Sequence, residues 1–302
     1  MTADVPPLDP DAAARVAAFG PLPPMRERGL TAVRDAIESA PLPADMPAMA
    51  AVEDCSAPGP AGPIPLRIYR PSTDSAAPGI LYFHGGGLVM GTNHSFEPLA
   101  RALAAASGAT VVAVGYRLAP ECPPPGQFDD CATATAWVAD NTAGLGLDAR
   151  RLAVAGDSAG GSLAAGVALA ARDHGHPSIC CQVLLYPGLD RDMAAPSITL
   201  LADAPMLSRD DIDYLHELAD GGVTPAHDAY RVPAYASDLG NLPPAIVVTG
   251  ACDPIRDWGE RYAARLRDVP LIMPTGGHGL RSALEAVFAR ARMQPRLVAE
   301  ID

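Results

Sequence analysis

Short apolar runs alternate with longer amphipathic stretches along the middle of the chain. Several of the runs are apolar at every position, which is typical of strands buried on both faces of a sheet. They predict strands at residues 65–70, 79–84, 110–117, 151–156, 182–187, 245–250 and 270–274. Between them, apolar residues spaced three and four apart predict helices at residues 96–107, 131–142, 160–174, 257–267 and 281–293. This alternation indicates an α/β fold, with a mostly parallel central sheet flanked by helices.

Three segments interrupt the alternation. Residues 49–70 contain the turn-prone sequence SAPGPAG, which predicts an antiparallel hairpin before the parallel strands. Residues 1–48 contain two short helical stretches broken by proline-rich sequences, and residues 190–230 contain another, for which Ser208 is the expected N-cap. We therefore expect a core domain of residues 49–189 and 231–302, covered at one edge by a helical cap from residues 1–48 and 190–230.

The composition is that of a globular protein without nucleic-acid or membrane partners. Hydrophobic residues make up 49% of the 302 positions, charged residues make up 19%, and the formal net charge is −13. An acidic protein does not favour the phosphate backbone of nucleic acids or an anionic membrane. The sequence contains no lysine, and this excludes a lysine nucleophile.

The sequence gives no sign of a metal site or a targeting segment. Its six cysteines form no C-x-x-C pair and have no zinc-type spacing with histidine, so we expect no metal and mostly buried, reduced thiols. The cysteines are Cys55, Cys122, Cys131, Cys180, Cys181 and Cys252. The first residues lack the basic start and apolar run of a signal peptide, and no segment is apolar for long enough to span a bilayer. We therefore expect a cytoplasmic protein.

The candidate nucleophile lies in the sequence GDSAG at residues 156–160, between a predicted strand and a predicted helix. In this context the G-x-S-x-G pattern is typical of a sharp turn that exposes Ser158 at the edge of the sheet. Such a turn brings neighbouring backbone close, so the flanking residues Gly156, Ala159 and Gly160 must be small. Taken alone, the pattern also fits a glycine-rich structural turn, whereas the phosphate-binding patterns G-x-G-x-x-G and G-x-x-x-x-G-K-[ST] are absent here.

A second motif supplies candidate main-chain donors. His84 ends a predicted strand and is followed by three glycines. Acyl transfer through a tetrahedral intermediate places negative charge on the former carbonyl oxygen, and preorganised N–H groups must stabilise that charge. We expect Gly85 and Gly86 to donate from this loop and Ala159, the residue after the nucleophile, to supply the remaining N–H. The two motifs together indicate acyl-transfer chemistry rather than a flexible loop beside a structural turn.

With these motifs, the sequence resembles the hormone-sensitive-lipase-like group of α/β-hydrolases, in which bacterial esterases are common. The resemblance covers residues 50–295 and rests on HGGG (residues 84–87), YRLAPE (116–121), GDSAGG (156–161), DPIRD (253–257) and GGHG (276–279). It implies an α/β-hydrolase core under a helical cap, with neither a metal nor an organic cofactor. It also implies hydrolysis of carboxylic esters with short or medium acyl chains.

The base must take a proton from the serine hydroxyl, which is a weak nucleophile on its own. The chain order Ser, acid, His of this fold excludes the two histidines that precede Ser158. Two others end the helix after the nucleophile, and two lie within residues 190–230. His278, on a glycine-rich loop after the last predicted strand, is therefore the expected base.

The acid should orient the imidazole and stabilise the imidazolium. Asp253 directly follows a predicted strand, where the catalytic loops of such sheets gather. Asp257 is the rival, although we expect it to cap the next helix. Asp157, beside the serine, is more typical of a local hydrogen-bonding residue. The family resemblance also points to Asp253, so the expected triad is Ser158, Asp253 and His278.

The substrate pocket departs from the family pattern. Leu88 stands where the family usually has an aromatic residue after the glycines, and Tyr214 is the one aromatic residue of the predicted helix in the second cap segment. The expected function is a serine carboxylester hydrolase acting on a small-molecule ester. The alternatives are an acyltransferase or lyase on the same scaffold, or a binding protein without catalysis. A homodimer is possible from the sequence.

Overall fold

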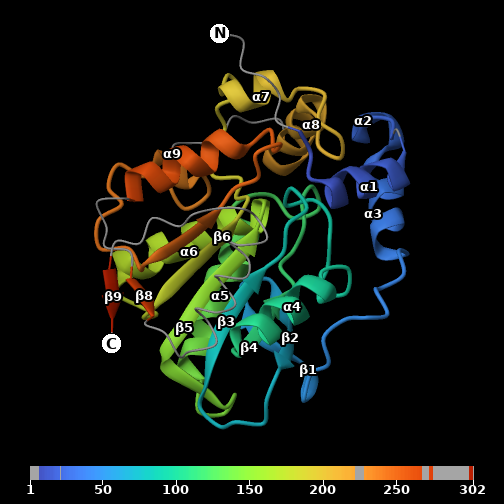
Figure 1. Cartoon of the computed structure of the whole chain (residues 1–302). Coiled ribbons are helices and arrows are strands. Elements are labelled where there is room, and N and C mark those ends of the chain that lie inside the picture. The colour runs from blue at the N-terminus through green and yellow to red at the C-terminus, as the bar shows by residue number, and fades with distance from the viewer. Residues whose placement is uncertain (1–6, 21, 222–227, 267–271, 275–298, 302) are drawn as a thin grey trace.

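A seven-stranded sheet forms the centre of the protein (Figure 1). The computed structural model describes residues 7–20, 22–221, 228–266, 272–274 and 299–301. The strand order is β1-β2-β4-β3-β5-β6-β7, in which β1 and β2 are antiparallel to their neighbours and the others pair in parallel. The strands are β1 (Ala51–Gly59), β2 (Gly62–Arg70), β3 (Ala77–Phe83), β4 (Thr110–Val114), β5 (Leu147–Asp157), β6 (Cys181–Leu185) and β7 (Ala245–Val248). This arrangement confirms the α/β fold and the antiparallel hairpin expected for residues 49–70.

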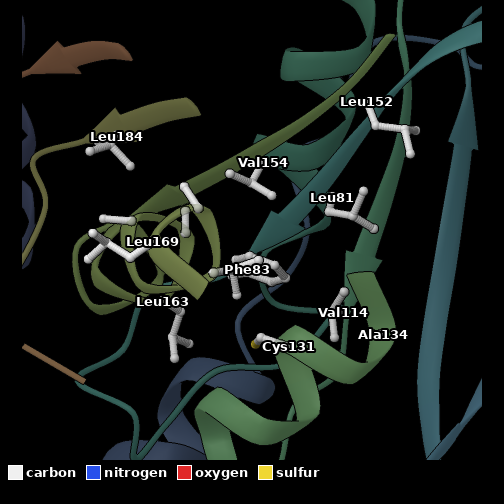
Figure 2. Packing of buried hydrophobic residues seen from close by; sticks show 14 of the residues in the cluster. Leu81, Phe83, Val114, Cys131, Ala134, Leu152, Val154, Leu163, Leu169 and Leu184 are labelled. Carbon is white, nitrogen blue, oxygen red and sulfur yellow. The ribbon is translucent and has the colours of Figure 1, made fainter. Parts of the chain in front are cut away.

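Helices connect the parallel strands and cover both faces of the sheet. They are α4 (Glu97–Ser107), α5 (Gly126–Asp140), α6 (Ala159–His174) and α9 (Arg256–Leu266). Alternate residues of β3 point to opposite faces, as the period of two requires. Leu81 and Phe83 pack with α5 and α6, as Figure 2 shows, whereas Ile80 and Tyr82 pack with α4 on the other face.

A helical layer lies over the carboxyl ends of the parallel strands (Figure 1). It consists of α1 (Pro10–Phe19), α2 (Met25–Arg28), α3 (Leu30–Glu38), α7 (Pro196–Leu200) and α8 (Arg209–Asp220). The side chain of Asp211 accepts a hydrogen bond from the N–H of Met25 at 2.7 Å, and this bond joins the two distant segments. Ser208 caps α8 in a reciprocal pair with Asp211, which confirms the predicted N-cap.

Arg34 anchors α3 to the loops beneath it. Its guanidinium donates to the main-chain oxygens of Val89 and Ala119 at 2.6 and 2.7 Å, and to the carboxylate of Glu121. Val89 and Ala119 are buried, so these carbonyls obtain from Arg34 the hydrogen bonds that water would otherwise supply.

Several elements differ from their predicted limits. Helix α5 begins directly after Pro125, five residues earlier than predicted, because proline is compatible with the start of a helix and not with its interior. The run at residues 270–274 gives only the short strand β8 (Ile272–Pro274), which pairs with β9 (Ala299–Ile301) outside the main sheet. The described part of residues 1–48 contains three helices rather than two. The helix predicted at residues 281–293 lies outside the described residues.

The cysteines are less buried than expected. Cys122 and Cys131 are buried in the core, but Cys55 and Cys180 are exposed. The prediction that the thiols are mostly buried is therefore wrong.

Candidate active site

A strained turn between β5 and α6 carries Ser158. The serine has a φ of +51°, in the region that residues with a side chain rarely adopt. A Cβ at Gly156 would collide with the main-chain oxygen of Gly160, and a Cβ at Gly160 would collide with the main-chain oxygen of Phe83. The small residues on either side of the serine are therefore required by the close approach of three backbone segments.

Main-chain hydrogen bonds hold the strained serine in place. Its N–H donates to the oxygen of Leu185 at 2.8 Å, and its own oxygen accepts from the N–H of Gly188 at 2.9 Å. The same oxygen accepts from the N–H of Gly161 at 3.0 Å, inside the first turn of α6. Surrounding structure that fixes a residue in this way is what allows backbone strain to persist at a functional site.

The carboxylate of Asp157 joins the glycine loop after β3 to this turn. Its Oδ1 accepts from the N–H of Gly85 at 2.9 Å and from the hydroxyl of Tyr82 at 2.6 Å. Burial raises the pKa of Asp157 to about 6, although the hydrogen bonds from Tyr82 and Gly85 act in the opposite direction. The carboxylate thereby fixes the position of the glycine loop relative to the nucleophile.

This bond corrects the expectation for Gly85. Its N–H is already donated to Asp157, so it is not available for a substrate oxygen. Gly86 and Gly87 have φ values of +104° and +62°, which turn the backbone sharply at this point. Among the hydrogen bonds of the described residues, the amides of Gly86, Gly87 and Ala159 have no acceptor.

His84 contacts the glycine loop and helps to hold it in place. Its ring stacks between Phe96 and Tyr116, with ring centroids 5.1 and 4.3 Å away, and its Nδ1 lies 2.8 Å from the oxygen of Gly85. Burial lowers the pKa of His84 to about 4, so the ring is neutral near pH 7. These contacts are typical of a structural histidine, and they agree with the exclusion of His84 as the catalytic base.

Ser158 lies on a small cavity between the sheet and the helical layer. The cavity has a volume of about 70 Å³. Its lining residues are Gly87, Leu88, Ser158, Ala159, Ser162, Gly188, Arg191, Leu207, Ile212, Leu215, His216, Arg231, Ile255 and Trp258. Most of these side chains are apolar, which is typical of a site for a small organic molecule.

The structure brings Leu88 to the cavity and leaves Tyr214 outside it. Leu88 lines the cavity directly after the glycine loop. Tyr214 lies on α8 beneath the guanidinium of Arg26, whose central carbon is 4.6 Å from the ring centroid. The residues of α8 that reach the cavity are instead Ile212, Leu215 and His216.

Asp253 follows β7, as predicted. Its Oδ1 accepts from the N–H of Ile255 at 2.9 Å, and burial raises the pKa of its carboxyl group. His278 lies outside the described residues. The rival acid Asp257 lies in the first turn of α9 and does not cap that helix; its carboxylate accepts from the N–H of Ser197 at 2.9 Å and joins α7 to α9.

Sequence reasoning missed the aromatic and basic groups of the cavity wall. Trp258 stacks on His216 at a centroid separation of 5.8 Å. Arg191 and Arg231 also line the cavity, although neither belongs to a recognisable motif. These two arginines give no local signal in the sequence, because the fold alone decides that they line the cavity of Ser158.

Across the described parts of the chain, the helices are too short or too polar to cross a bilayer.

Comparisons with known proteins identify the family. A family model for the alpha/beta hydrolase fold matches residues 80–271. Over 243 residues the chain is 42% identical to Esterase LipI of Mycobacterium tuberculosis, covering 79% of this chain and 75% of that one. It is 44% identical over 211 residues to Carboxylesterase NlhH of the same species, covering 67% of this chain and 65% of that relative, slightly under two thirds of its length.

Solved structures share the fold over nearly the whole chain. The hyperthermophilic esterase from the archaeon Pyrobaculum calidifontis has a TM-score of 0.81 and 34% identity, covering 95% of this chain and 97% of that one. The ester-hydrolase EH1AB1 from the metagenome of Lake Arreo, complexed with a derivative of bipyridine phosphonate, has a TM-score of 0.82 and 33% identity, covering 94% and 98%. Together with the motifs and the strained serine turn, these matches show that the chain belongs to the α/β-hydrolase family, in its hormone-sensitive-lipase-like group.

Proposed function

We propose that the protein hydrolyses carboxylic esters with short to medium acyl chains, through an acyl-enzyme on Ser158. One observation carries this proposal above the others. Ser158 stands on a strained turn at a cavity, beside main-chain amides that have no acceptor among the described residues. The names of the esterase relatives support the same reaction. Nothing in the described structure favours acyl transfer to another acceptor, a lyase reaction or binding without catalysis.

The amides of Gly86, Gly87 and Ala159 would stabilise the oxyanion. Gly87 takes the place expected for Gly85 as an oxyanion donor, because the N–H of Gly85 is donated to Asp157. Ala159 also begins α6, where free N–H groups and the helix dipole favour negative charge. The loss of one such donor typically raises the barrier by about 3–4 kcal/mol.

The reaction proceeds in two steps. Ser158, deprotonated by His278, attacks the ester carbonyl, and collapse of the tetrahedral intermediate releases the alcohol, which His278 protonates. Water activated by the same histidine then releases the acid. Asp253 would orient the histidine. Its place after β7 and the raised pKa of its partly buried carboxyl group fit an acid enclosed in the site.

The cavity favours acyl groups at the short end of this range. Its volume of about 70 Å³ is far below the ~300–1,000 Å³ typical of pockets for drug-sized ligands. We propose that residues 1–48 and 190–230 act as a cap that encloses this cavity. The cytoplasmic location and the homodimer stay predictions.

A labelling experiment tests the nucleophile. A fluorophosphonate probe should label the native protein, and Ser158→Ala should abolish both labelling and p-nitrophenyl acetate hydrolysis, with a loss of about 10⁴-fold or more in kcat. Ser162→Ala is the matched control, because Ser162 is the other serine of the same cavity. Loss of labelling in Ser162→Ala, with labelling retained in Ser158→Ala, would show that the nucleophile is wrongly assigned.

A further inference from the structure

Two arginines converge on the cavity that contains Ser158. Arg191 follows β6 and Arg231 precedes the short 3₁₀ helix Pro233–Tyr235, so the chain brings them together from segments 40 positions apart. Their side chains are 19% and 21% exposed, and both line the cavity. Both also line a smaller adjoining cavity, so the pair lies where the two cavities meet.

These two positive charges share one carboxylate. Asp220, at the end of α8, is 7% exposed and accepts from Nη2 of Arg231 at 3.1 Å and from Nη2 of Arg191 at 3.4 Å. Nε of Arg191 lies 3.4 Å from the other carboxylate oxygen, but it is buried and makes no hydrogen bond within the described residues. One carboxylate balances one arginine, so the wall has one positive charge in excess.

The other lining residues do not remove this excess. The residues that line the two cavities include no aspartate or glutamate among those described. His216 adds no charge, because burial, and then the nearby charge of Arg191, lower its pKa to about 3. A positive wall is notable in a chain with a net charge of −13, where carboxylates are abundant elsewhere.

A purely structural role explains only part of this arrangement. One arginine would be sufficient to hold the buried carboxylate of Asp220 and the end of α8. A second one crowds two like charges together and leaves guanidinium N–H groups at the cavity surface. Burying a cation without full pairing is unfavourable, and such a group is satisfied when an anion occupies the cavity. Guanidinium groups bind carboxylates in paired, charge-assisted hydrogen bonds.

We propose that the natural substrates are esters that carry a free carboxylate, which Arg191 and Arg231 bind while Ser158 attacks the ester carbonyl. The inference rests on the proposed esterase function and names the substrate class of the same site. The free carboxylate can belong to the acyl side, as in a half-ester of a dicarboxylic acid, or to the alcohol side, as in an acylated hydroxy acid. Both present the same anionic group to the arginines.

The test compares each charged ester with a neutral amide of the same shape. On the acyl side, monoethyl succinate and monoethyl glutarate are compared with their ω-amide ethyl esters. On the alcohol side, 4-acetoxybutanoate is compared with 4-acetoxybutanamide. We expect kcat/KM to favour the charged ester of at least one pair by tenfold or more, and the better pair identifies the side that carries the charge.

Substitutions then assign the preference to the arginines. Arg191→Met and Arg231→Met each leave one arginine to pair with Asp220, and each should reduce the charged-to-neutral ratio to near one. Asp220→Asn should raise that ratio, because it leaves both positive charges unbalanced. Arg150→Met is the matched control: it removes a positive charge from a side chain that is 91% exposed and outside both cavities, and it should keep the native ratio.

The outcomes separate this inference from the proposed function. A protein that hydrolyses neutral esters but shows no preference for any of the three charged esters overturns the inference alone. The same holds if Asp220→Asn and Arg191→Met change the ratio in the same direction, as a merely structural pair would. A protein that hydrolyses p-nitrophenyl acetate but none of these esters also overturns the inference alone. A protein that hydrolyses neither these esters nor p-nitrophenyl acetate overturns the proposed function, and the inference with it.

Discussion

The buried carboxylate of Asp157 gives a prediction that can be worked through quantitatively. The pKa of this group is raised from 3.8 to about 6, and burial is the main cause. Between these two values the unfolded chain releases the proton while the folded protein retains it. Stability therefore falls as the pH rises from about 4 to about 6, and above that range the contribution of this group no longer changes with pH.

The size of the effect follows from the shift. A shift of about two units, at about 1.4 kcal/mol per unit, corresponds to about 3 kcal/mol in the free energy of unfolding. Asp157→Asn removes the titration but retains an Oδ1 that can accept from Gly85 and Tyr82. The variant should therefore gain about 3 kcal/mol relative to the native protein between pH 4 and pH 7. Other titrating groups are common to both proteins and cancel in the difference.

Urea denaturation from pH 4 to pH 8 measures this difference directly. Tyr82→Phe serves as the second variant, because it removes a 2.6 Å hydrogen bond that lowers the pKa while leaving the carboxyl group in place. Its pH-dependent range should extend to higher pH. If the difference between Asp157→Asn and the native protein is the same at pH 4.5 and pH 7.5, the reasoning about burial is refuted.

Three further substitutions test the supports of the site by urea or thermal denaturation. Gly160→Ala should lower the free energy of unfolding by more than about 4 kcal/mol, because the new Cβ would collide with backbone. The control Gly144→Ala places a Cβ 3.6 Å from its nearest neighbouring atom and should change the free energy of unfolding by less than about 1 kcal/mol. Equal effects would contradict the packing of the turn. Ser208→Ala should destabilise α8 by about 1 kcal/mol through loss of its cap, and an unchanged melting temperature would count against the cap. Arg34→Met leaves two buried carbonyls without donors and should cost about 2–3 kcal/mol. Glu121→Gln, at a 64% exposed side chain, should cost less than about 1 kcal/mol, and the reverse order would show that the ion pair dominates.

Features that depend on neighbouring residues could be predicted from the sequence. Apolar runs marked the strands, the SAPGPAG turn marked the hairpin, and Ser208 marked the start of α8. The small residues around Ser158 indicated the close approach of backbone that the structure contains. Strand period and capping work locally, because they are set by residues a few positions apart, and so does the close approach of Gly156 to Gly160; the contact of Gly160 with Phe83 is a tertiary one. The sharp turn could therefore be predicted before any tertiary contact was known.

Which groups of the site are available to a substrate depends on contacts between distant parts of the chain. Gly85 and Gly87 look equivalent in the sequence, but a carboxylate 72 positions away binds the N–H of Gly85. The aromatic side chain of Tyr214 suggests a pocket residue, yet it lies against Arg26 and does not line the cavity. The excess charge beside Ser158 likewise arises from side chains far apart in the chain. Charge balance and hydrogen-bond satisfaction depend on three-dimensional neighbours, and no periodicity in the sequence encodes them.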